Sequence, residues 1–312
     1  MERRSQVLIL GAGCAIGRNL QRALGVNRTV GTYRRHRVPN GLFFDVPTME
    51  ISDVVEQPHR FSHAIILLAE TDPDRCFRDK AATAAVNVDA TKRIITWLWD
   101  HGIKPVFASS RAVFDGEKGN YAEKDPTRPI TEYGQQKREI ERFLETAEAT
   151  YATLRLSSVV STEPGDGTLF TNWLSSLEAG GVIRCAEGQR FSPVLIDDAV
   201  NAFVDAIERD LRGLYHVAGP VAMTRIDMLR LLLRELRRYG PCDPEIEGCR
   251  LADFPTAERR ALDTSMQSGK LVAATGIRLT SPEQICADVA ANAWRLRCGP
   301  FRDTQPGTRR VL

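Results

Sequence analysis

The chain has 312 residues, of which 43% are apolar and 26% charged, and this composition is typical of a globular protein and excludes a disordered one. Its length allows two ordinary domains or one large fold with an added lobe. Its 42 basic and 40 acidic side chains leave a net charge of +2, so nothing in the charge balance indicates a nucleic-acid partner or an anionic membrane surface. We therefore expect a small-molecule ligand.

The apolar runs are too short for a secretory signal or a membrane span. The first run, VLIL, has four residues, whereas a signal needs about 7 to 15 apolar residues and a spanning helix roughly 20. The seven cysteines include no C-x-x-C pair and show no metal-ligand spacing with the five histidines. We expect a cytoplasmic protein with reduced cysteines, no membrane contact and no metal ion.

Short apolar runs alternate with helix-length segments over the first 160 residues. The strand-like runs lie at 7–10, 29–33, 42–44, 64–69, 105–109 and 152–156, and the longest helical segment lies at 75–101. Continuous apolar strands separated by helices indicate a parallel sheet that is covered on both faces. The sequence therefore predicts an α/β fold with a doubly wound parallel sheet of the Rossmann type.

The alternation loosens in the second half of the chain. Helices are predicted at 167–180, 196–210, 224–239 and 281–297, and short strands near 182–185, 192–195 and 214–217. We interpret residues 1–160 as the Rossmann domain, joined by about 191–218, and residues 161–190 and 219–300 as a smaller, partly interleaved C-terminal substrate lobe. The tail 301–312, rich in Gly, Pro and Arg, is predicted to be disordered.

A glycine-containing turn, GAGCAIG at 11–17, connects the first strand to a helix. Backbone N–H groups and the start of a helix can hold a pyrophosphate at such a turn. The spacing fits G-x-x-G-x-x-G at Gly11 and Gly17, with Cys14 in place of the middle glycine. The predicted dinucleotide contacts in this turn are Gly11, Cys14, Ala15, Ile16 and Gly17. A tight turn without a ligand is the alternative interpretation.

The end of the second strand indicates which dinucleotide binds. An acidic residue there would bond the ribose hydroxyl of NAD, but this chain has Arg34 and Arg35. Guanidinium groups suit the extra phosphate of NADP(H), which is the predicted cofactor, although an exposed basic turn would look the same. Asp45 could cap a helix or accept a hydrogen bond from the adenine amino group. Val46 and Ala69 complete the predicted cofactor contacts on these loops.

The segment EYGQQK contains Tyr133 and Lys137, four residues apart. This spacing alone also suits a solvated helix face. In a helix that begins near Thr131, however, the two side chains stack one turn apart. We expect the ammonium group to lower the pKa of the phenol, so that Tyr133 can give its proton to a carbonyl oxygen.

Seven motifs in register resemble the extended short-chain dehydrogenase/reductases, and among them the dTDP-4-dehydrorhamnose reductase family. They are LILGAGCAIGRNL, VNVDATKRII, VFASSRAVFDG, EYGQQKREIE, GQRFSPVLIDDAV, GLYHVAGP and ALDTSMQSGKL. The resemblance implies a catalytic set of Ser110, Tyr133 and Lys137, in which Ser110 bonds the reacting oxygen and Lys137 also holds the nicotinamide ribose. It further places Asn87 near the nicotinamide, and Ser110, Arg111, Tyr133, Gln189 and Arg190 at the substrate.

The resemblance is incomplete beside the catalytic serine. Family members commonly have Asp and an aromatic residue after it, whereas this chain has Arg111 and Ala112. We expect a changed substrate pocket as a result. Dehydratases of the same superfamily have an Asp-Glu pair at this place, and the absence of that pair makes dehydration an unsuitable interpretation.

The sequence thus predicts an NAD(P)-dependent oxidoreductase, specifically an NADPH-dependent reductase of a keto group on a nucleotide-linked sugar such as a 4-keto-6-deoxy sugar. A sugar-nucleotide epimerase and a non-catalytic NADP-binding regulatory subunit are the alternatives. The expected partner is the sugar nucleotide, and a homodimer is left open.

Overall fold

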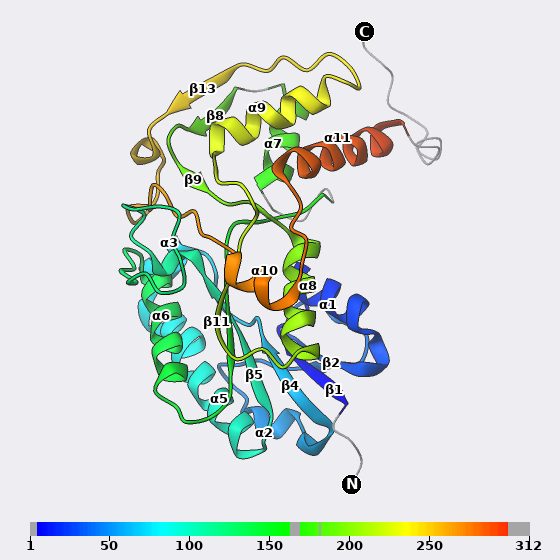
Figure 1. The fold of residues 1–312 in the computed structure, drawn as a ribbon, viewed down its shortest axis with the longest axis vertical. Coiled ribbons are helices and arrows are strands. Elements are labelled where there is room, and N and C mark those ends of the chain that lie inside the picture. Colours follow the sequence, from blue (N-terminus) through cyan, green and yellow to red (C-terminus); the bar gives the residue numbers. More distant parts are fainter. Residues whose placement is uncertain (1–4, 163–168, 181, 299–312) are drawn as a thin grey trace.

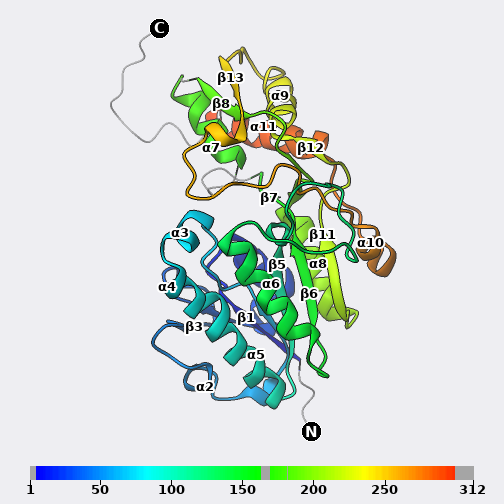
Figure 2. The same ribbon diagram turned by 90° about the vertical axis from the view of Figure 1, so that its left-hand side faces the viewer.

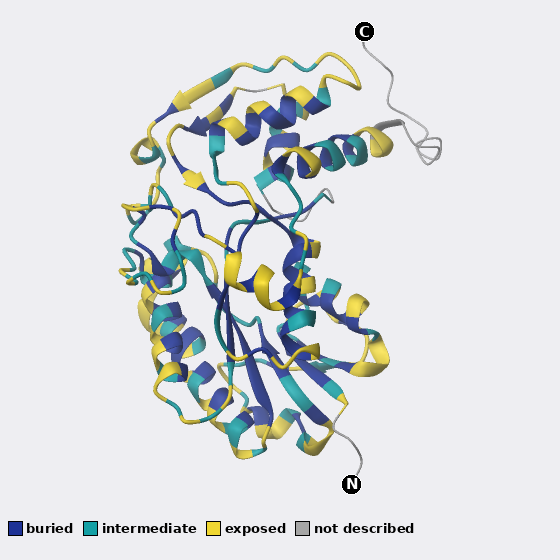
Figure 3. Cartoon of the chain, viewed as in Figure 1, coloured by how far each residue is buried: buried dark blue, intermediate teal, exposed yellow. Residues whose placement is uncertain are grey.

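The computed structural model describes residues 5–162, 169–180 and 182–298. Its centre is a seven-stranded parallel sheet in the order β11-β6-β5-β4-β1-β2-β3. These strands are β1 Gln6–Leu10, β2 Thr29–Tyr33, β3 Gly41–Phe43, β4 Phe61–Ile66, β5 Lys104–Ser110, β6 Ala152–Leu156 and β11 Gly213–Val217. The predicted α/β doubly wound sheet is confirmed, and Figure 3 shows its strands buried in the middle of the molecule.

Helices cover both faces of the sheet because the strands are apolar on both sides. Val7 and Ile9 of β1 pack in the cluster that includes α1 and α8, whereas Leu8 and Leu10 pack in the cluster that includes α5 and α6. The helices on the first face are α1 Ala15–Leu24, α8 Ile196–Glu208 and the short α10 Gly269–Thr275; those on the second face are α2 Ile51–Val54, α5 Thr91–Asp100 and α6 Glu132–Glu145. Figures 1 and 2 show the two helical layers.

A second lobe lies beyond the carboxyl ends of the sheet strands (Figures 1 and 2). It contains α7 Leu169–Glu178, β8 Ile183–Ala186, α9 Arg225–Leu236, β13 Ile246–Cys249 and α11 Pro282–Cys298. Its core is formed by side chains of α7, α9 and α11, including Trp173, Leu229 and Val289. Three short strands, β9 Arg190–Phe191, β10 Val194–Leu195 and β12 Met223–Thr224, lie between this core and the sheet, where β10 pairs with β7 Val159–Val160 and β9 with β12.

The chain crosses between the two parts more than once. After β9 and β10 it returns to the sheet through α8 and β11, and β11 forms the edge next to β6. The exact division into residues 1–160, 191–218 and the lobe segments stays a prediction, and the predicted disordered tail 301–312 lies outside the described residues. The described cysteines form no disulfide.

The segment predicted as one helix over 75–101 is not continuous. It consists of α3 Pro73–Arg78, α4 Lys80–Ala84, a π-helical turn at Ala85–Ala90, and α5. Asp79 interrupts it because its backbone leaves the helical region and its side chain accepts a hydrogen bond from Ala82 N at 3.3 Å, which caps α4. Of the strand predicted at 192–195, only Val194–Leu195 (β10) is a strand, and β9 lies just before the predicted range.

Candidate active site

The turn between β1 and α1 requires glycine at both ends. Gly11 has φ +89°, and a Cβ there would lie 2.9 Å from Leu68 N. At Gly17 a Cβ would lie 2.6 Å from the Cα of Ala12, so no side chain fits between the start of α1 and the turn. The sulfur of Cys14 accepts a hydrogen bond from Gly17 N at 3.3 Å and caps α1. The cysteine therefore replaces a glycine without opening the turn.

A cavity of about 560 Å³ opens beside this turn at the carboxyl ends of β1, β2 and β4. Six predicted cofactor contacts line it: Gly11, Cys14, Arg34, Arg35, Val46 and Ala69. The other seven, Ala15, Ile16, Gly17, Asp45, Asn87, Tyr133 and Lys137, do not line it. Lining residues that the sequence analysis missed include Thr32, His36, Phe44, Glu70 and Thr83. Some of these directly follow a strand of the predicted parallel sheet, which is the signal that could have identified them.

The two arginines after β2 differ in their contacts. Arg34 Nε lies 2.7 Å from the Asp45 carboxylate, so two residues predicted to act separately on the cofactor form an ion pair with each other. Arg35 is exposed and forms no ion pair with another described residue. Because an unpaired guanidinium is available to a phosphate, Arg35 is the better placed of the two for a charged ligand group.

Helix α6 carries the predicted phenol and ammonium groups. Thr131 caps it by accepting a hydrogen bond from Gly134 N at 3.2 Å, which confirms the predicted helix start. Lys137 Nζ lies 5.8 Å from the centroid of the Tyr133 ring. Ser110 is the last residue of β5, and its side chain lies close enough to the Tyr133 phenol to influence its pKa. The structure therefore brings the predicted catalytic set of three together.

The electrostatics of Tyr133 differ from the prediction. Burial raises the pKa of its phenol to about 12, while the hydrogen bond from Ser110 and the charge of Arg111 oppose that rise. The expected net lowering by Lys137 was wrong, because burial dominates and Lys137 is not among the groups that lower the pKa of Tyr133. Burial also lowers the pKa of the Lys137 ammonium, to about 8. A protonated phenol at neutral pH is the form that can donate a proton.

A buried charged network holds Lys137 and its helix. Lys137 Nζ donates to Ala108 O at 2.9 Å, and the charge of Glu141 one turn later opposes the fall in the pKa of Lys137. Arg155 on β6 donates to both Glu141 oxygens at 2.8 Å, and the Ser109 hydroxyl donates to the same carboxylate at 2.5 Å. These groups fasten α6 to β5 and β6, so the position of Lys137 is fixed by the sheet.

Asn87 lies in the π-helical turn and is 4% exposed. Its side chain accepts from Glu70 N at 2.8 Å and donates to Glu70 O at 2.9 Å and to Gln136 Oε1 at 2.7 Å. It therefore fixes the loop after β4, which lines the cavity, to the helix that carries Tyr133. Its predicted place near the nicotinamide stays a prediction.

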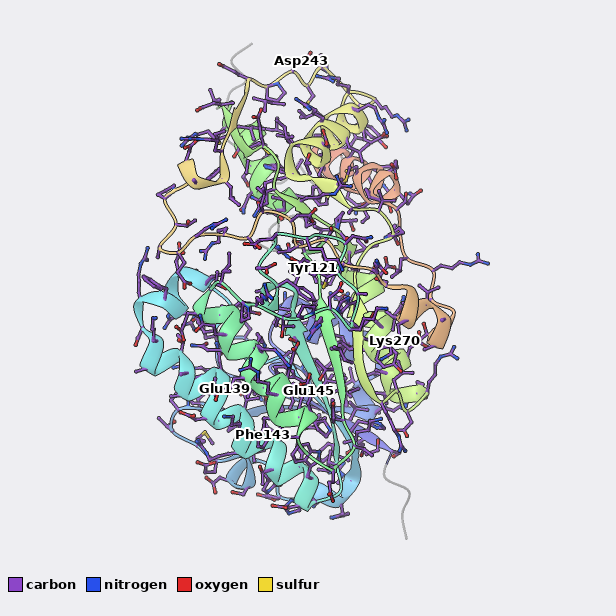
Figure 4. The ribbon with its side chains drawn as sticks, turned by 60° about the vertical axis from the view of Figure 1, so that its left-hand side comes forward. Tyr121, Glu139, Phe143, Glu145, Asp243 and Lys270 are labelled. Carbon is purple, nitrogen blue, oxygen red and sulfur yellow. The ribbon has the colours of Figure 1, made fainter. Side chains whose placement is uncertain are left out.

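The loop between β5 and α6 reaches toward the second lobe. Figure 4 shows Tyr121 of this loop at the junction, beyond Glu139 of α6. The ring of Tyr121 stacks on Phe114 with 4.0 Å between centroids, and its backbone N–H donates to Ser265 O at 2.9 Å. These contacts hold the loop that follows Ser110 against the segment that precedes α10.

The predicted substrate residues lie at this junction. Arg111, the first residue of the 3₁₀-helix Arg111–Val113, donates to the hydroxyl of Thr264. Gln189 is buried, and its backbone carbonyl accepts a hydrogen bond from the backbone N–H of Arg225 at 2.8 Å. The structure thus brings Arg111 and the segment containing Gln189 to the same junction, and Thr264 and Arg225 are neighbours that the sequence analysis did not identify.

Arg190 is more exposed than its neighbours. Its side chain is 46% exposed, lies 4.0 Å from the Asp263 carboxylate and donates to Ala222 O at 3.0 Å. These contacts satisfy the guanidinium within the lobe. A role at the substrate stays a prediction for Gln189 and Arg190.

Among the residues that the structure describes, no helix is both long and apolar enough to cross a membrane. The same part of the chain contains no group of three or more His, Cys, Asp or Glu side chains that could hold a metal ion.

Comparison with known proteins gives consistent matches. The family model described as the RmlD substrate binding domain matches residues 5–294. A probable low-salt glycan biosynthesis reductase of Haloferax volcanii is 29% identical over 73% of this chain and 80% of its own length. A dTDP-4-dehydrorhamnose reductase of Aggregatibacter actinomycetemcomitans is 24% identical over 93% of this chain and 99% of its own. A solved dTDP-4-dehydrorhamnose reductase of Bacillus anthracis in complex with NADP has a TM-score of 0.76 at 20% identity, covering 90% of this chain and 97% of that one.

Proposed function

The chain belongs to the RmlD substrate binding domain family of extended short-chain dehydrogenase/reductases, and on this basis we propose that it is an NADPH-dependent reductase of a keto group on a nucleotide-linked sugar. A 4-keto-6-deoxy sugar nucleotide is the proposed substrate. The observation that carries this proposal is the convergence of the Ser110 and Tyr133 hydroxyl groups beside the buried Lys137 at the carboxyl end of β5.

The cavity beside β1 suits a dinucleotide. Gly11 leaves backbone exposed where a Cβ would fill the space, and the cavity of about 560 Å³ extends from this turn to Arg35. Gly11, Gly13 and Cys14 would hold the pyrophosphate, and Arg35, helped by Arg34, would hold the additional phosphate of NADP(H). When bound, the nicotinamide supplies the hydride for carbonyl reduction.

The residues of the chain handle the proton and the developing charge. Both hydroxyl groups would donate to one carbonyl oxygen, since the Ser110 side chain lies close enough to the Tyr133 phenol to influence its pKa. Tyr133 is protonated at neutral pH and gives up its proton as negative charge develops on that oxygen. The Lys137 ammonium, held by Ala108 O and near Glu141, then stabilises the phenolate that remains.

The substitution Tyr133→Phe tests this assignment because it removes one oxygen and keeps the ring. NADPH oxidation with keto-sugar nucleotides should fall by about 10² to 10⁴, while NADPH affinity should stay unchanged. Tyr239→Phe is the matched control, since Tyr239 is exposed on the second lobe. Near-normal turnover of Tyr133→Phe would refute the assigned role. Interconversion of hydroxyl epimers without net NADPH oxidation would show an epimerase instead.

A further inference from the structure

Two arginines at the junction between the sheet and the second lobe have no acidic partner. Arg111 follows Ser110 directly, and Arg225 is the first residue of α9. Neither forms an ion pair with another described residue, although most of the described arginines do, such as Arg34, Arg155 and Arg260. Arg111 donates to the neutral hydroxyl of Thr264, and Arg225 Nε is buried without a hydrogen-bond partner. Both guanidinium groups therefore keep an uncompensated charge.

The backbone brings these two side chains from different parts of the fold to one place. Thr264, which bonds Arg111, donates its backbone N–H to Arg190 O at 3.0 Å. Arg190 pairs in turn with Thr224 in the small β9–β12 sheet, and Arg225 is the next residue. The two positive charges act on each other, and burial together with this repulsion lowers the pKa of Arg111 to about 10. Two like charges are thus held near each other at partly buried positions.

Such an arrangement is costly unless an anion arrives. A buried charge is normally paired, because its lost hydration must be compensated by an opposite charge or by several hydrogen bonds. The phenol of Tyr133 cannot serve as that anion in the resting protein, because burial raises its pKa to about 12 and leaves it neutral. A bound molecule that carries a negative charge would compensate this pair.

We propose that Arg111 and Arg225 together bind an anionic group of the substrate: phosphate oxygens of a sugar nucleotide or a carboxylate on its sugar. The site rests on the proposed function, since it adjoins Ser110 and Tyr133. The sequence analysis also placed Arg190 at the substrate, but its guanidinium already has Ala222 O and Asp263 as neighbours. A planar guanidinium suits either anion because both accept two parallel hydrogen bonds.

Calorimetric titration of the full chain tests the site without turnover. UDP-glucose, UDP-glucuronic acid, dTDP and uridine would be titrated into the unmodified protein, Arg111→Met and Arg225→Met. Each substitution should weaken binding of an anionic ligand about tenfold or more, since it removes a charge-assisted contact, and should leave uridine unaffected. Arg230→Gln is the matched control, because Arg230 lies on α9 but is 63% exposed and pairs with Asp227.

The pattern of losses identifies the anion. A loss confined to UDP-glucuronic acid would assign the pair to a sugar carboxylate, whereas equal losses for dTDP and both sugar nucleotides would assign it to the diphosphate. The unfolding temperature of ligand-free Arg111→Met should stay level or rise, because an unpaired buried charge has been removed.

Several results would overturn the proposal. Unchanged affinities in both variants, or no binding of any of the four ligands, would contradict it. So would a larger loss of affinity in Arg190→Gln than in Arg111→Met. A lowered unfolding temperature of Arg111→Met together with weaker uridine binding would show a structural role instead. Arginine-dependent binding without any NADPH oxidation across a keto-sugar panel would contradict the proposed function and leave this site standing.

Discussion

Removing the charge of Glu141 should destabilise the protein strongly, although Glu141 is not one of the predicted cofactor or substrate contacts. The carboxylate is 1% exposed and the Arg155 guanidinium 2%, and two contacts of 2.8 Å join them. In Glu141→Gln the amide can replace at most one of these acceptors, so a cation stays buried without a counter-charge. Breaking a buried pair from one side costs about 3 to 5 kcal/mol.

Urea unfolding at pH 7 measures this cost. The double variant Glu141→Leu with Arg155→Met should recover most of the loss, because no unpaired charge remains. Glu139→Gln is the matched control: Glu139 lies on the outer face of α6 (Figure 4), is 52% exposed, and should change stability by no more than about 0.5 kcal/mol. A cost below about 1 kcal/mol for Glu141→Gln would refute the reasoning.

Two further predictions concern the β1–α1 turn and a buried histidine. Gly17→Ala should lower the free energy of unfolding by more than about 1 kcal/mol and weaken NADPH binding, because its Cβ would lie 2.6 Å from Ala12 Cα. Gly269→Ala is the control and should do neither, because a Cβ there would meet nothing within 4 Å. Equal unfolding temperatures of the two variants would contradict this prediction. Burial and the charge of Arg155 lower the pKa of His216 to about 3. Between about pH 6.5 and pH 3 this histidine is therefore protonated in the unfolded chain but not in the folded one. The free energy of unfolding should fall as the pH drops through this range, by up to about 1.4 kcal/mol per pH unit. An equally steep loss of stability in His216→Gln would exclude this cause.

The sheet could be predicted from the sequence because its strands are buried on both faces. Runs such as 7–10 and 64–69 are apolar throughout, and each is followed by a loop. The break at Asp79 could not be predicted from apolar periodicity, because it depends on one side chain capping a backbone amide. Two short strands, β12 and β13, were missed because they show no clear apolar pattern, although the short strands β3 and β8 were predicted.

Some residues of the candidate site could likewise be predicted from the sequence, and others could not. Ser110, Tyr133 and Lys137 stand in motifs with fixed spacing, so the sequence was enough to select them. Arg225 stands in none of the quoted motifs, and Thr264 stands in ALDTSMQSGKL without any spacing that relates it to Arg111. The two come to the junction only through contacts between segments more than 30 residues apart in the chain. The direction of the Tyr133 pKa was wrong for a related reason, since burial is a property of the folded chain.

The contact between α6 and the residues after Ser110 explains how the chemistry and the specificity can vary separately. A Cβ at Gly134 would lie 2.1 Å from Ala112 O, so the helix packs directly on this backbone. That close approach involves only backbone of Ala112, and it keeps Tyr133 near Ser110 whatever side chain follows the serine. The side chain of Arg111 is thereby left to face Thr264 of the substrate lobe. We therefore expect a change at Arg111 to alter ligand binding while Tyr133, the proposed proton donor, stays in place.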